Sequence, residues 1–83
     1  MCYFYILYSR NLDRYYIGHS CDSLENRLRQ HLYEHGGFTG KAKDWKLVYQ
    51  EAFPSKSVAY ARERQVKRWK NRLLVERLIE EGT

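Results

Sequence analysis

The strongest constraint on the fold is a run of strand-forming residues at the start of the chain. Residues 2–9 are aromatic or branched almost throughout, which favours a strand covered on both faces. Residues 14–20 have the composition of a second strand, and turn-forming residues, including Asn11 and Asp13, lie between the two. Because so short a link cannot carry a parallel crossover, these segments predict an antiparallel hairpin.

A helical pattern follows the hairpin. Asp22 and Ser23 are typical of a helix start, and Glu25 would complete a capping box. The residues Leu24, Leu28 and Leu32 recur at helical spacing, which predicts an amphipathic helix over 23–34. Glycines 36–37 are expected to end this helix.

The second half of the chain predicts a strand followed by two helices. Residues 45–53 alternate well enough for a third strand, with one face formed by Trp45, Leu47, Tyr49 and Phe53. After Pro54 the pattern is helical from Ser57 onward, with one side formed by Val58, Ala61, Val66 and Trp69. Asn71 marks a break before a last helix through Leu74, Leu78 and Ile79. The order β-β-α-β-α-α predicts an α+β fold, a three-stranded, mainly antiparallel sheet with flanking helices.

Length and charge narrow the possible functions. With 83 residues the chain is expected to form a single domain, 1–83, with a modest core. The net charge of +5 favours a polyanion such as nucleic acid or an anionic membrane surface. The longest apolar run, residues 3–8, is far too short to span a membrane. The eight tyrosines fit a core, a nucleic-acid surface or chemistry, and composition does not decide between these.

The two cysteines, Cys2 and Cys21, show no metal-type spacing, and two cysteines do not make a disulfide scaffold. Since the start of the chain has no secretory pattern, a reducing cytoplasm is the expected location.

Five segments are notable in order along the chain: Tyr3-Phe4-Tyr5, Tyr16-Ile17-Gly18, Arg27-Leu28 with His31, Phe38-Thr39 with Trp45 to Tyr49, and Ala59, Glu63, Lys67 and Trp69 at helical spacing. Together they resemble the GIY-YIG nuclease family in its small free-standing bacterial type. The resemblance extends to the nuclease domain found at the N-terminus of a bacterial repair excinuclease.

The resemblance implies a metal-dependent endonuclease that hydrolyses phosphodiester bonds in DNA with one Mg²⁺ or Mn²⁺ ion. Glu63 is then the metal ligand; the alternative is an ordinary exposed helix pair with Lys67. Arg27 is the expected phosphate clamp, because a guanidinium stays charged and suits an oxyanion. Tyr5 and Tyr16 would orient or deprotonate the attacking water; which one is the base stays open, with Tyr16 preferred.

The resemblance also gives roles to further residues. His19 and His31 are expected to assist at the water or phosphate, although lone histidines are often structural. Gly18 would allow a close backbone approach to a helix or the substrate. The expected contacts to nucleic acid are basic residues, which are otherwise merely solvated: Lys41, Lys67, Arg68 and Lys70.

With no second DNA-binding domain in the chain, we expect recognition of DNA structure rather than sequence, in repair or recombination, or help from a protein partner. A monomer is the expected state. The alternative function is a non-catalytic nucleic-acid-binding module of the same fold.

Overall fold

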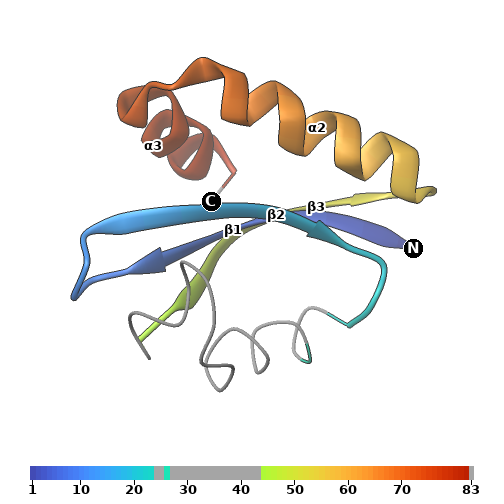
Figure 1. The fold of residues 1–83 in the computed structure, drawn as a ribbon, viewed down its shortest axis with the longest axis horizontal. Coiled ribbons are helices and arrows are strands. Elements are labelled where there is room, and N and C mark those ends of the chain that lie inside the picture. The colour runs from blue at the N-terminus through green and yellow to red at the C-terminus, as the bar shows by residue number, and fades with distance from the viewer. Residues whose placement is uncertain (24–25, 27–43, 83) are drawn as a thin grey trace.

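The structure, a computed structural model, describes residues 1–23, 26 and 44–82 (Figure 1). Its elements in order are β1 (Cys2–Ser9), β2 (Arg14–Ser20), β3 (Lys46–Phe53), α2 (Lys56–Trp69) and α3 (Arg72–Glu81). The helix predicted over 23–34 lies almost wholly outside the described residues. The other elements match the predicted α+β order.

The sheet has the order β2-β1-β3, and both pairings are antiparallel. The predicted hairpin is confirmed, with Tyr5 opposite Gly18 and Leu7 opposite Tyr16. β1 is the central strand, and its residues 4–7 are at most 1% exposed. This burial on both faces is what its unbroken apolar run predicted.

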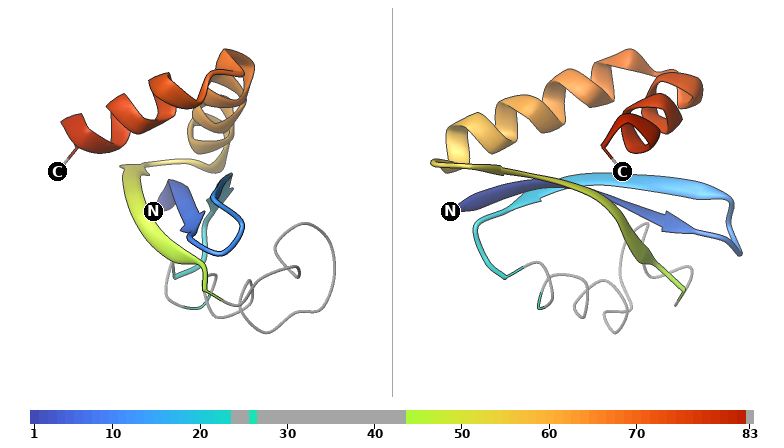
Figure 2. Two further views of the ribbon diagram at one scale, coloured as in Figure 1. Left: turned by 90° about the vertical axis from the view of Figure 1, so that its left-hand side faces the viewer. Right: turned by 180° about the vertical axis from the view of Figure 1, so that it is seen from behind.

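Both helices cover the same face of the sheet (Figures 1 and 2). The main core lies between the sheet and these helices, where Phe4 and Ile6 of β1 pack with Val66 of α2 and Val75 of α3. Because side chains alternate along a strand, Tyr5 and Leu7 point to the opposite face. There Leu7 forms a second cluster with Trp45.

The face predicted for the third strand is wrong. The pairing of β1 with β3 shifts register between Ile6 and Leu7, so that Tyr49 is opposite Ile6 but Leu47 is opposite Leu7. This irregularity puts one extra residue into β3 and reverses the alternation there. Tyr49 and Phe53 therefore pack in the main core, whereas Trp45 and Leu47 belong to the second cluster.

The predicted buried side of α2 also needs correction. Val66 is buried as expected, but Val58 is 43% exposed and Ala61 is exposed too. The buried residues of the helix are Ala59, Glu63 and Val66. A charged residue, Glu63, thus lies on the buried side of the helix. A prediction from the spacing of apolar residues cannot place a charged residue there.

The break between the helices falls where the sequence predicted it. Lys70 ends α2 in the left-handed conformation with φ 46°. Asn71 caps α3, its side chain accepting a hydrogen bond from the Leu73 amide at 2.9 Å. No helix in the described part of the chain is long and apolar enough to cross a membrane.

A disulfide joins Cys2 to Cys21, with the Cα atoms 4.0 Å apart. No bond between these two cysteines was predicted from the sequence. The hairpin register was the missing signal: Tyr3 is opposite Ser20, so the cysteines occupy the next opposed positions outward. The bond fastens the start of β1 to the residue after β2.

Candidate active site

The two tyrosines of the predicted site lie together on the sheet face away from α2 and α3. Tyr5 comes from β1 and Tyr16 from the adjacent strand β2; their rings stack with centroids 6.4 Å apart and an interplanar angle of 27°. Tyr5 is only 1% exposed, whereas Tyr16 is partly exposed and contacts Trp45 edge to face. The hairpin therefore gives the two phenols different access to solvent.

Gly18 makes room for the Tyr5 ring. A Cβ atom at this position would lie 2.8 Å from Tyr5 Oη, 2.9 Å from its Cζ and 3.1 Å from Tyr16 Cε1. The sequence predicted a close approach to a helix or the substrate, whereas the neighbours here are the rings of Tyr5 and Tyr16. Any side chain here would displace the ring.

Glu63 projects from α2 toward β2 and is 8% exposed. Its Oε1 lies 3.0 Å from His19 Nδ1, and its Oε2 accepts a hydrogen bond from Lys67 Nζ at 3.4 Å. Because a carboxylate only accepts, His19 donates through Nδ1. The Lys67 contact of the alternative reading exists, but the carboxylate is buried rather than part of an ordinary exposed pair.

The contact between His19 and Glu63 was not foreseen. His19 was predicted to assist at the water or phosphate, whereas here it contacts the proposed metal ligand, and its ring centroid lies 5.0 Å from that of Tyr60. A histidine next to Gly18 on a strand that pairs with β1 points toward α2 by simple alternation. That signal could have placed it beside the helix.

The structure thus arranges the proposed residues in two groups, one on each face of the edge strand β2. Tyr5, Tyr16 and Gly18 lie on the face away from the helices, and His19 meets Glu63 on the other. β2 is the edge of the sheet described, so the two groups lie on either side of this edge.

The remaining predicted residues divide between described and undescribed parts of the chain. Arg27, His31 and Lys41 lie outside the described residues. Lys67 is engaged with Glu63, Arg68 is exposed on α2, and Lys70 lines a pocket beside β2.

The donor set for a metal ion is small. Within the described residues no group of three or more His, Cys, Asp and Glu side chains could hold one. Mg²⁺ commonly keeps most of its waters and takes one or two carboxylates with substrate phosphates. Glu63 alone fits such an ion, provided that His19 and Lys67 release its oxygens.

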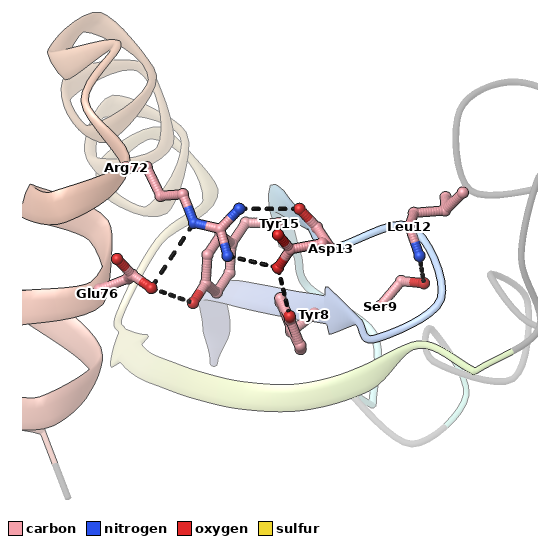
Figure 3. Close-up of polar contacts among 7 residues, drawn as sticks. All are labelled: Tyr8, Ser9, Leu12, Asp13, Tyr15, Arg72 and Glu76. Atoms are coloured by element: carbon pink, nitrogen blue, oxygen red, sulfur yellow. Dashed lines mark hydrogen bonds and ion pairs between the residues drawn. The ribbon is translucent and has the colours of Figure 1, made fainter.

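A second polar network ties the hairpin turn to α3 (Figure 3). Asp13, in the left-handed region at φ 51°, accepts hydrogen bonds from Arg72 Nη2 at 2.5 Å and from the Tyr8 hydroxyl at 2.6 Å. These bonds, that from Arg72 above all, lower the pKa of Asp13 to about 2. The Tyr15 hydroxyl donates to Glu76 at 3.3 Å, and Arg72 Nε is 3.6 Å from the same carboxylate. No local sequence pattern predicts contacts between residues so far apart.

The whole arrangement lies in a stretch that matches a known family. The model of the GIY-YIG catalytic domain matches residues 1–77, which include Tyr5, Tyr16, Gly18, His19 and Glu63. No curated protein and no solved structure shows a significant match to the chain.

Proposed function

The chain belongs to the GIY-YIG family and carries a nuclease-type domain, and from this we propose that it is a divalent-metal-dependent DNA endonuclease. The observation that carries the proposal is the buried Glu63 carboxylate, held by His19 beside the hairpin that presents Tyr5 and Tyr16. Burying a carboxylate is unfavourable unless it is paired, so this helix keeps an acidic group where an apolar one would pack.

We propose Tyr16 as the residue that orients or deprotonates the attacking water. A phenol has a pKa near 10, so the base must be helped to lose its proton and must reach the water. Tyr16 is partly exposed, whereas Tyr5 is 1% exposed and packs over Gly18. Tyr5 then serves to position the Tyr16 ring.

Glu63 is the proposed metal ligand. A divalent ion at this carboxylate would stabilise the charge that develops on the phosphoryl oxygens. His19 and Lys67, which hold the two oxygens, would be freed to donate hydrogen bonds to the phosphate. Arg27 and His31 are proposed as further phosphate contacts, on the family resemblance alone.

We propose that the substrate is recognised by its structure rather than its sequence, in DNA repair or recombination. The chain would act as a monomer, alone or with a protein partner that adds specificity.

The test compares Glu63→Gln with Glu81→Gln, which removes the same charge at an exposed position on α3. Wild type is expected to nick single-stranded, flap or branched DNA with Mg²⁺ or Mn²⁺. Glu63→Gln should lose cleavage while keeping its thermal transition and its DNA binding, and Glu81→Gln should stay active.

Failure of the wild type on every DNA structure with both metals would reject the enzyme. Binding without cleavage would then support the alternative, a nucleic-acid-binding module. Equal activity in Glu63→Gln would show that the reaction does not use this carboxylate.

A further inference from the structure

A pocket of about 470 Å³ opens between β2 and the junction of α2 with α3. Arg14 and Tyr16 line it from the strand, Lys67 lines it from α2, and Lys70 and Arg72 line it from the junction. Four basic side chains therefore surround a space of the size that accommodates a small ligand.

The acidic residue in the wall does not neutralise this charge. Asp13 is taken by Arg72, which donates to both its carboxylate and its backbone carbonyl (Figure 3). Arg14 and Lys70 are exposed, and neither forms a salt bridge within the described residues. Two cations on opposite walls are thus available to an anion.

The pocket adjoins both groups of the candidate active site. Tyr16 is part of its wall as a residue of β2, and its ring lies on the other face of the strand, stacked on Tyr5. Lys67, another wall residue, is 3.4 Å from the Glu63 carboxylate. A chain of phosphates that passes the site along the β2 edge would enter this space.

We propose that the pocket binds one nucleotide of a single strand, adjacent to the phosphate that is cleaved, with Arg14 and Lys70 contacting its phosphates. The proposal rests on the nuclease function and adds a subsite to it. A single strand is flexible enough to insert one unstacked nucleotide into a pocket of this size. A duplex is stiff, so its base-paired nucleotides would lie across the opening without entering. Basic grooves bordered by aromatic side chains are the usual surfaces for single strands.

The experiment measures binding without catalysis. A fluorescein-labelled oligothymidylate is titrated in EDTA by anisotropy against wild type, the double variant Arg14→Gln/Lys70→Asn and a matched double variant, Arg10→Gln/Arg77→Gln. The control removes the same charge from exposed residues outside the pocket. Asparagine suits position 70 because it tolerates the left-handed conformation there.

We expect the pocket variant to bind about tenfold more weakly at roughly 50 mM salt, and its salt slope to fall by about 1.4, at about 0.7 per lost phosphate contact. The control should change far less, and unlabelled duplex should compete poorly.

Equal weakening in both double variants would overturn the proposal, because net charge alone would then explain the binding. Equal competition by duplex would overturn it too. A wild type that binds through the pocket but never cleaves would reject the nuclease and leave the subsite standing, so the two failures are distinguishable.

Discussion

The contact between Gly18 and Tyr5 makes Gly18→Ala the most direct test of the tyrosine arrangement. The new methyl group would lie 2.8 Å from Tyr5 Oη and 2.9 Å from Cζ, closer than Cβ atoms normally approach. Tyr5 is 1% exposed and its ring stacks on Tyr16, so the ring must shift within the interior of the protein. Overpacking of this kind costs about 1–3 kcal/mol, and we expect the free energy of unfolding to fall by that amount.

Activity should fall more steeply than stability. The ring that must move stacks on Tyr16, and a misplacement of about 1 Å in a catalytic arrangement can lower the rate about 100-fold. Urea unfolding and a cleavage assay under conditions where the variant is fully folded measure the two effects separately.

A second variant shows whether the clash itself is responsible. Tyr5→Phe removes the hydroxyl that the methyl group would approach most closely, so adding Gly18→Ala should cost less stability in that background. If Gly18→Ala unfolds and cleaves like wild type, the ring does not lie over residue 18 and the proposed roles of both tyrosines lose their geometric basis.

Two further predictions concern stability. Replacing Cys2 and Cys21 by serine should lower the free energy of unfolding by about 3 kcal/mol, as expected for a loop of about 20 residues, and reduction of wild type should match it in urea titrations. The low pKa of Asp13, about 2 because of its bond with Arg72, stabilises the fold at pH values above the ordinary value of 3.8. This contribution should vanish as the pH falls from about 4 to 2, so the free energy of unfolding of Asp13→Asn should depend less on pH in this range. If the variant keeps the pH dependence of wild type there, Asp13 and Arg72 do not form the proposed ion pair.

The sequence was sufficient for elements with a clear local pattern. The hairpin followed from the apolar run of 2–9 and its short link, and the break at Asn71 followed from its capping chemistry. Interactions between distant segments were not predictable in this way. The register shift opposite Ile6 depends on how β3 fits against β1, and it moved Tyr49 and Leu47 to different faces.

The candidate site shows the same division. Family motifs indicated which residues to consider, and in the structure the rings of Tyr5 and Tyr16 stack. The tether of Asp13 to Arg72 joins positions 59 residues apart and leaves no trace in either local sequence. The disulfide, by contrast, was available from the hairpin register once Tyr3 was set opposite Ser20.

The buried stripe of α2 supplies the strongest physical argument for function. Ala59 and Val66 lie in it without polar atoms to satisfy, whereas Glu63 requires both His19 and Lys67 to compensate its burial. Replacing such a group by an apolar residue is often neutral or stabilising, so packing alone gives no reason for a carboxylate at this point. Its two partners are both donors that could turn to an anion when the carboxylate binds a cation. This arrangement is the reason for proposing a cation at Glu63 with a phosphate beside it at the β2 edge.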